Sequence, residues 1–341
     1  MAQAAALLAA GGLVAFPTET VYGLGADAEN PAAVAAIYAA KGRPQDHPVI
    51  VHLAPDADLA YWASDIPDAA RQLAAAFWPG PLTLILKRAS HIPAAVSGGQ
   101  DTVGLRCPSH PVAIALLQAF KGGKGGIAAP SANKFGHVSP TTAQHVRDEF
   151  RDALRDEFGA DGPLLTVLDG GQCEVGIEST IVDLSRLASH GPVLLRPGHI
   201  SAEAIAAVID LLPVAPDAQA PRASGTLASH YAPHTPVAMQ DSARLTATLA
   251  QMHLAGRKVA LIHYSALPSA HAEARVPASP DGFAYALYAA LRAMDTSGAD
   301  LILVEAPPQD DAWRGVNDRL RRAAHGSTGI VHGLLNTALP D

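Results

Sequence analysis

The sequence predicts a two-domain α/β protein, and three observations support this fold class. Segments of strand-like and helix-like pattern alternate from the first residues onward. Hydrophobic residues make up 49% of the chain and aromatic residues only 5%, with much alanine, which is typical of folded helix-and-sheet proteins. The 341 residues are enough for two hydrophobic cores. Several strands lack a following helix, so we expect a mixed sheet.

The chain begins with a helix and a short strand. The first ten residues are apolar without a basic leader, and they predict a helix ended by Gly11 and Gly12. A strand over 13–16 follows, and Pro17 ends it because proline cannot donate to a central ladder.

A second helix begins at Asn30, whose side chain suits an N-cap, with Pro31 in the first turn. Gly42 and Pro44 end it. Further strands are predicted over 49–53, 82–87, 102–106, 127–129, 166–169, 179–184 and 193–196. Further helices are predicted over 68–76, 111–120, 141–158 and 202–211.

The composition changes after residue 212. Residues 213–236 hold five prolines and little periodicity, so we interpret them as a linker between domains 1–212 and 237–341. The second domain repeats the α/β pattern as a small doubly wound unit without the GxGxxG of a dinucleotide site. Its strands are predicted over 258–263 and 300–305, and its helices over 282–294 and 311–324.

Charge and cysteine content exclude several classes of protein. The net charge is −8 and no run of five like charges occurs, which argues against strong nucleic-acid binding. No stretch of 18 apolar residues occurs, so no membrane span is expected. Cys107 and Cys173 form no CxxC pair, which favours a reducing compartment, the cytoplasm, over a zinc site.

The most informative stretch is the polar turn after the first strand. Thr18, Glu19 and Thr20 place two hydroxyls and a carboxylate in an apolar setting. Gly23 and Gly25 follow and let the backbone approach a ligand. Such loops carry ligand sites in α/β proteins, although a plain polar turn explains the same residues.

Lys41 and Arg43 lie two residues apart at a helix end. Together they can hold a polyphosphate, the arginine through its fork and the lysine as a point charge. The simpler interpretation is that Lys41 complements the helix dipole.

Two later segments add polar groups beside strands. Thr102 and Arg106 share a face of one strand, and a buried arginine needs an anionic partner, from the core or from a ligand. Ser131 and Asn133 follow another strand in a loop that can bind an anion or form a turn. Ser139 precedes Pro140 and suits an N-cap or a phosphate contact.

Other motifs give weaker evidence of function. His52 is alone and suits a structural role, and the histidines show no metal-ligand spacing. The glycine-rich residues 121–126 predict a flexible surface turn, and no nucleophile has an evident base. The cations Lys41, Arg43, Arg106 and Arg196 beside hydroxyl-rich loops favour chemistry by positioning and charge neutralisation on a nucleotide and an anionic small molecule.

Eight blocks in order resemble the YrdC-like family of threonylcarbamoyl-adenylate synthases, in its long form. They are FPTETVYGLGADA (16–28), KGRPQDHPVIVH (41–52), FWPGPLTLIL (77–86), TVGLRCP (102–108), APSANKFGHVSPT (129–141), GIESTIVDL (176–184), LLRPG (194–198) and SHYAPHTP (229–236). The resemblance implies a YrdC-like twisted mixed sheet and a Rossmann-like C-terminal domain. It departs at His47, where the family often has a smaller polar residue, and at 311–315, which lack a glycine-rich turn.

The resemblance also implies the reaction and its residues. L-threonine, bicarbonate and ATP, with Mg²⁺, would give threonylcarbamoyl-AMP and pyrophosphate for the machinery that modifies tRNA, with no metal held by protein side chains. Lys41 and Arg43 would be catalytic. The ATP side would comprise Arg43, His47, Thr102, Ser131, Asn133, Ser139, Arg196 and Tyr231. The threonine side would comprise Thr20, His52, Arg106, Ala129 and Ser179.

Two other functions compete with this one. A module binding tRNA or double-stranded RNA is opposed by the acidic charge and the lack of an aromatic and basic stripe. A carbamoyl transferase of metallocentre assembly would need further domains for which the chain has no room. Residues 213–236 are longer than a tether requires, and we expect them to act as a lid in which Tyr231 covers the nucleotide.

Overall fold

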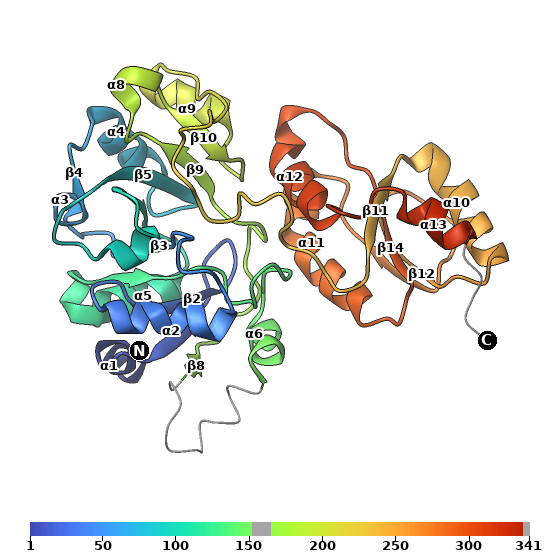
Figure 1. Cartoon of the computed structure of the whole chain (residues 1–341), viewed down its shortest axis with the longest axis horizontal. Helices are drawn as coiled ribbons and strands as arrows, with labels where there is room; N and C mark the ends of the chain where they lie inside the picture. The colour runs from blue at the N-terminus through green and yellow to red at the C-terminus, as the bar shows by residue number, and fades with distance from the viewer. Residues whose placement is uncertain (152–164, 337–341) are drawn as a thin grey trace. The chain divides into compact units, whose positions relative to one another are not determined.

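The computed structural model describes residues 1–151 and 165–336 (Figure 1). The chain divides into two compact units: unit 1 is Met1–Phe135 with Ser139–Thr226, and unit 2 is Gly136–Val138 with Leu227–Asp341. The predicted linker is therefore shared, since 213–226 belong to unit 1 and 227–236 to unit 2. The predicted helix over 141–158 lies partly outside the described residues.

Unit 1 is built on a ten-stranded mixed sheet, as predicted. The strand order is β10-β9-β5-β6-β3-β7-β2-β1-β8, with β4 paired to β5. Three pairs are parallel (β1 with β8, β3 with β6, β5 with β9), and the other pairs in this order are antiparallel, including the three consecutive pairs from β3 to β1. The strands are β1 Leu13–Phe16, β2 Gly23–Asp27, β3 Ile50–Leu53, β4 Ala63–Ser64, β5 Leu82–Arg88, β6 Thr102–Arg106, β7 Gly126–Ala128, β8 Leu165–Val167, β9 Thr180–Asp183 and β10 Val193–Arg196.

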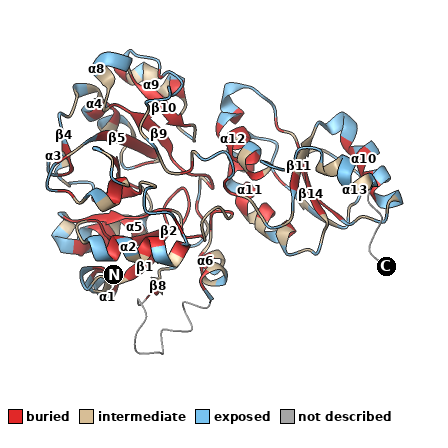
Figure 2. Cartoon of the chain, in the orientation of Figure 1, coloured by how far each residue is buried: buried red, intermediate tan, exposed pale blue. Residues whose placement is uncertain are grey.

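Helices α2 and α4 of unit 1 each bury one face and expose the other, as Figure 2 shows. In α2 the Asn30 side chain accepts hydrogen bonds from two backbone N–H groups, and Gly42 ends the helix in the left-handed region (φ 62°). The helices are α1 Ala2–Ala9, α2 Pro31–Lys41, α3 Leu59–Trp62, α4 Asp68–Phe77, α5 Pro111–Ala119, α6 Ala143–Glu149, α8 Leu187–His190 and α9 Ala202–Ile209, with 3₁₀ turns η1 Ala94–Ser97 and η2 Phe120–Gly123.

Several details of unit 1 differ from the predictions. The glycine-rich residues 23–27 form a fully buried strand, β2, because Gly25 allows close packing: a Cβ there would lie 2.7 Å from Ile127 and 2.8 Å from Phe16. Ser139 is not an N-cap; Thr142 caps α6 through a bond from the His145 N–H. The predicted flexible turn at 121–126 is also wrong in part, since it contributes to η2 and β7.

Unit 2 holds a four-stranded parallel sheet of order β11-β14-β12-β13, which agrees with the Rossmann-like prediction. Helices α11 and α12 cover one face and α10 and α13 the other (Figure 1). The strands are β11 Val237–Gln240, β12 Val259–His263, β13 Ala272–Arg275 and β14 Leu301–Glu305. The helices are α10 Ser242–Leu254, α11 Pro280–Asp295, η4 Asp311–Trp313, α12 Arg314–Ala323 and α13 Ile330–Asn336.

Several elements of unit 2 were not predicted: β11, α10, β13 and α13. Strand β13 reads Ala-Glu-Ala-Arg with no residue buried, so it lacks the apolar face that marks a strand. Helix α10 buries only Leu245, Thr248, Leu249 and Met252, a weak stripe in a polar segment. None of the helices in the described part of the chain has the length and apolarity needed to cross a bilayer.

Candidate functional site

The turn after β1 is held by a compact network of hydrogen bonds from threonine hydroxyl groups. Thr18 Oγ1 accepts hydrogen bonds from the backbone N–H of Thr20 and of Val21, both at 3.2 Å, and donates to the Val21 carbonyl at 2.7 Å. This local network stabilises the turn that begins after Pro17, where the strand has ended. It also holds Thr20 in a fixed, buried position. The turn therefore presents Glu19 and Thr20 to the interior of unit 1.

Arg106, at the end of β6, meets this turn. Its Nη2 lies 2.6 Å from Glu19 Oε1 and 2.9 Å from Thr20 Oγ1, and its Nε donates to the Gly80 carbonyl at 3.3 Å. The anionic partner that a buried arginine needs is thus a core carboxylate. Within the described residues Nη1 has no protein partner, so this nitrogen is left for a ligand.

His52 stands beside Arg106, because the two residues are register partners in the parallel pair β3 and β6. The imidazole is buried edge-on to Phe16 at 5.9 Å, and its Nδ1 has no hydrogen-bond partner among the described residues. Burial first, and then the charge of Arg106, lower the pKa of His52 to about 3. His52 is therefore neutral near pH 7 and offers a polar atom to an uncharged ligand group.

The low pKa of His52 makes the protein less stable in acid. Unfolding restores a pKa near 6.5. As the pH falls below that value, the unfolded state binds a proton at His52 while the folded state does not, so acid favours unfolding. We expect this residue to remove about 2 kcal/mol of unfolding free energy between pH 7 and pH 5. Urea unfolding of the wild type and His52→Gln at both pH values measures the difference, and an equal pH dependence in the two proteins would contradict it.

Lys41 joins the helix end to the loop after β7. Its Nζ donates to the backbone carbonyls of Ser131, at 2.6 Å, and Asn133. The side chain is buried, and desolvation followed by the neighbouring charge of Arg43 lowers the pKa of Lys41 well below its usual value. The predicted dipole role is too simple, because this lysine organises the Ser131 loop and retains one N–H for a ligand.

The Ser131 loop also runs beside the residues after the Thr20 turn. The backbone of Leu24 donates to Pro130, that of Ala132 donates to Tyr22, and Gly23 forms a bridge with Ser131. These bonds bring two of the motifs predicted from sequence side by side in unit 1.

Arg43 and Arg196 are linked through Ser224, a residue of the predicted linker. Arg43 Nη2 donates to the Pro48 carbonyl at 2.8 Å and lies 3.3 Å from Ser224 Oγ. Arg196 Nη1 donates to the Ser224 carbonyl at 2.8 Å, and its Nε and Nη2 bond to the carbonyl and hydroxyl of Ser179. Two buried cations are thereby held near one backbone segment.

The remaining candidates in unit 1 take varied positions. Ser139 Oγ donates to Glu178 Oε1 at 2.5 Å, and Ala129 N–H donates to the Ile50 carbonyl beside His52. Thr102 lies at the opposite end of β6 from Arg106. The half-buried His47 ring packs edge-on against Phe135 at 5.4 Å, and burial, then Arg43, lower its pKa.

Tyr231 belongs to unit 2, where its ring is fully packed. It lies 5.7 Å from the ring of Tyr288, and the Arg319 guanidinium lies 5.4 Å from its centroid. The backbone of Tyr231 has a positive φ of 60°, unusual for a bulky residue. These contacts match the simpler interpretation of the linker, in which the ring packs on a domain.

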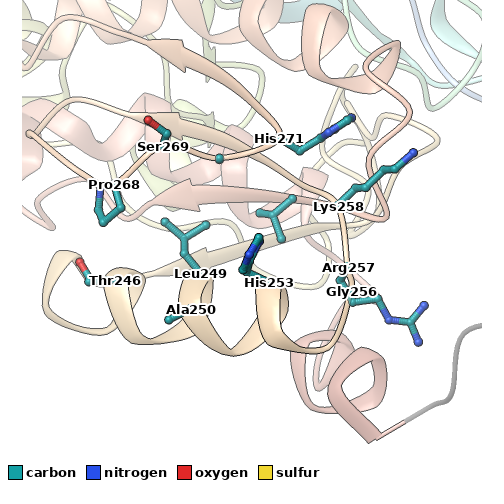
Figure 3. Close-up of a pocket in the computed structure, with 12 residues that line it drawn as sticks. Thr246, Leu249, Ala250, His253, Gly256, Arg257, Lys258, Pro268, Ser269 and His271 are labelled. Atoms are coloured by element: carbon teal, nitrogen blue, oxygen red, sulfur yellow. The ribbon is translucent and has the colours of Figure 1, made fainter.

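Among the hollows in the described part of unit 2, two are about as large as a ligand pocket, and neither is lined by a candidate residue. One, of about 700 Å³, lies between α10 and the starts of β12 and β13, with Lys258, His253 and His271 on its walls (Figure 3). The other, of about 660 Å³, is lined by β11 and residues 321–331. Over residues 1–151 and 165–336, no group of three or more histidine, cysteine or acidic side chains is arranged to hold a metal.

Sequence reasoning missed three contributors to the site. Glu19 lies in the turn that attracted attention, but nothing in the sequence shows that it pairs with Arg106. Glu178 and Ser224 carry no sequence signal, because each acts through a contact with a residue at least 28 positions away. Both cysteines are buried, and burial raises the pKa of the Cys107 thiol to about 12, so neither suits a nucleophile.

The arrangement suits binding and charge neutralisation. Lys41, Arg43 and Arg196 supply buried positive charge beside backbone and hydroxyl donors, and Arg106 with His52 forms a second polar group. No side chain in these groups is an activated nucleophile. Such a site can hold two anionic reactants and stabilise charge that develops between them.

Two family models match the chain. The Sua5, YciO and YrdC model, described as telomere recombination, covers residues 6–198. The model described as the threonylcarbamoyl-AMP synthase C-terminal domain covers residues 200–325. Together they account for both units.

Curated relatives and solved structures agree with the models. A threonylcarbamoyl-AMP synthase of Pyrococcus abyssi is 38% identical over 332 residues, which are 94% of this chain and 93% of the relative. One from Bacillus subtilis is 38% identical over 340 residues, 96% and 93% of the two chains. The crystal structure of P. abyssi Sua5 complexed with L-threonine superposes with a TM-score of 0.84 at 36% identity, over 95% and 93% of the chains.

Proposed function

This chain belongs to the Sua5/YrdC family of threonylcarbamoyl-AMP synthases, and from that premise we propose that it makes threonylcarbamoyl-AMP and pyrophosphate from L-threonine, bicarbonate and ATP. The observation that carries the proposal is the contact of Lys41 with the carbonyls of Ser131 and Asn133. It joins two motifs that lie 90 residues apart into one cationic loop suited to a triphosphate.

In the proposed reaction, the threonine amine and bicarbonate give a carbamate with loss of water. A carbamate oxygen attacks the α-phosphorus of ATP, the bond to the β-phosphate oxygen breaks, and pyrophosphate leaves with the negative charge. Lys41, Arg43 and Arg196 are placed to neutralise the phosphates, while Ser131, Asn133, Ser139, Thr102 and the backbone of His47 line the nucleotide side.

The threonine side comprises Arg106, His52, Thr20, Ser179 and the backbone of Ala129. Nη1 of Arg106 would receive the substrate carboxylate, because Nη2 and Nε are engaged by the protein. His52 remains neutral and can exchange a hydrogen bond with the substrate hydroxyl through its unpartnered Nδ1. This arrangement orients the amine without a covalent intermediate.

We propose that Mg²⁺ takes part. The described residues offer no carboxylate cage for it, so the ion would be carried by the phosphates of ATP, as Mg²⁺ commonly is in ATP-using enzymes. It would supply Lewis-acid stabilisation of the phosphate oxygens when bound. The cationic side chains contribute their charge stabilisation independently of it.

The proposed products are directly testable. We expect ATP to be cleaved between the α- and β-phosphates only when threonine and bicarbonate are both present, with pyrophosphate and threonylcarbamoyl-AMP detected by chromatography. Omitting either substrate should remove the pyrophosphate signal. Detection of ADP and orthophosphate as the sole products would refute the proposal.

We further propose that 1–212 is the catalytic domain, that 237–341 is an accessory domain and that 213–236 act as a lid containing Tyr231. The observation in favour is that this segment already touches Arg43 and Arg196 through Ser224. Within unit 2 the Tyr231 ring packs against Tyr288 and Arg319.

Trypsin provides a sharp test of the lid, because Arg222 is the sole lysine or arginine in residues 213–236. Its side chain is 53% exposed. We expect ATP with threonine to slow cleavage after Arg222 several-fold, while cleavage after the exposed Lys258 is unchanged.

Tyr231→Ala should lose activity beyond the loss in Tyr288→Ala, which removes the ring packed against it. Unchanged cleavage, with full activity of Tyr231→Ala, would make the segment a simple connection.

The product is proposed to pass to the tRNA threonylcarbamoyl transfer machinery in the cytoplasm. Free, buried thiols at Cys107 and Cys173 are in keeping with a reducing compartment.

A further inference from the structure

Glu19 and Arg106 form a buried ion pair at the edge of the proposed threonine subsite. The side chains are each 4% exposed, and Nη2 and Oε1 lie 2.6 Å apart. The second carboxylate oxygen, Oε2, accepts the backbone N–H of Ser109 at 3.1 Å. The backbone carbonyl of Glu19 also accepts a bond from the Val175 N–H, so the main chain of this residue is held as well as its carboxylate.

The ion pair determines which nitrogen of the guanidinium a ligand can reach. Nε is bonded to Gly80, and the two hydrogens of Nη2 are directed to Glu19 and Thr20. The ligand therefore meets Nη1, with the negative charge of Glu19 on the adjacent nitrogen. The two side chains together carry no net charge.

An amino acid at neutral pH is also a carboxylate beside an ammonium with no net charge. An arginine alone would favour any carboxylate, and most strongly one without a nearby positive group. A carboxylate next to that arginine compensates the ammonium and lowers the subsite's affinity for simple anions. Because both charges are buried, this effect is screened little by salt.

We infer that Glu19 is a positioning and specificity residue, which orients Nη1 of Arg106 and matches the subsite to a zwitterionic α-amino acid. This inference rests on the proposed function, since it concerns how the threonine subsite selects its ligand. The chemical class it selects is an amino acid over the 2-hydroxy acid of the same shape.

The test compares two ligands by calorimetry without ATP: L-threonine and 2,3-dihydroxybutanoate of matching stereochemistry, in which a hydroxyl replaces the ammonium. We expect wild-type protein to prefer threonine. In Glu19→Gln, threonine affinity should fall about 10–100-fold, while affinity for the hydroxy acid should hold or rise because the neighbouring negative charge that weakens simple anions is gone. Glu19→Asp keeps the charge and should keep the wild-type preference within threefold.

Asp183→Asn is the matched control, because Asp183 is also a buried carboxylate bonded to an arginine, Arg186, outside the site. It should lower the melting temperature without altering the ratio of the two affinities. Parallel loss of both ligands in Glu19→Gln would mean a structural role only and would overturn the inference. If Glu19→Gln does not fold, two other results overturn the inference equally. One is a wild-type ratio of threonine to hydroxy-acid affinity near one, and the other is loss of the wild-type ratio in Glu19→Asp.

The outcome is separable from that of the proposed function. Pyrophosphate release by wild type, with an unchanged preference in Glu19→Gln, defeats this inference alone. Selective threonine binding without pyrophosphate release in complete reaction mixtures defeats the proposed reaction and leaves the assignment of Glu19 in place.

Discussion

Lys41→Met is expected to reduce pyrophosphate release by about 100–1,000-fold in kcat/KM, the loss typical of removing one preorganised donor from a transition state. Methionine fills a similar volume, so the core around this buried position should survive. The variant loses the N–H left for the phosphates and also leaves the carbonyls of Ser131 and Asn133 without their donor.

The pKa of Lys41 sharpens this expectation. Burial and Arg43 lower it in the empty site, and a triphosphate brought against the amine would raise it again. Lys121→Met, a change to a lysine paired with Asp27 and Glu29 outside the site, should retain activity within about threefold. Near-normal turnover in Lys41→Met would refute the role proposed for this residue.

Arg106→Lys should raise the KM for threonine by about 10–100-fold and leave the KM for ATP within about twofold. Lysine supplies one point charge in place of a planar fork that simultaneously engages Glu19, Thr20 and Gly80. The loss of a charged hydrogen bond to the substrate carboxylate costs about 1.5–3 kcal/mol, which corresponds to that change.

Arg88→Lys provides the comparison, since Arg88 is a partly buried arginine that bonds backbone carbonyls at the end of β5. It should change neither KM, while both variants are checked for melting temperature. A loss of ATP affinity in Arg106→Lys, with the threonine requirement unaltered, would assign Arg106 to the nucleotide side instead.

Much of the framework could be predicted because its signals are local. The N-cap at Asn30, Pro31 and the left-handed Gly42 fix one helix within a dozen residues of sequence. The buried strand over 13–16 reads as an apolar run bounded by turn residues, and in the strand over 102–106 alternation puts Thr102 and Arg106 on one face. Strand β2 was missed because its glycines have low strand propensity, and only packing against Phe16 and Ile127 makes them suitable.

For the site, sequence indicated the residue types but not their partners. Lys41 and Ser131 were each ambiguous, and a contact of 2.6 Å between the Lys41 amine and the Ser131 carbonyl brings the two motifs together. The partner of Arg106 remained open between a core carboxylate and a ligand, and the structure assigns Glu19. The prediction that Tyr231 covers the nucleotide stays a prediction, and within unit 2 its ring packs against Tyr288 and Arg319.

By itself, the sequence determined the mixed α/β fold class, the cationic and hydroxyl-rich character of the loops and, through eight ordered blocks, the family. Only the tertiary structure decided which charges neutralise one another and which donors remain for substrates. The physical reason is that periodicity and capping act within a few residues, whereas pairing, desolvation and pKa depend on neighbours such as Glu19 and Arg106, which lie 87 positions apart in the chain.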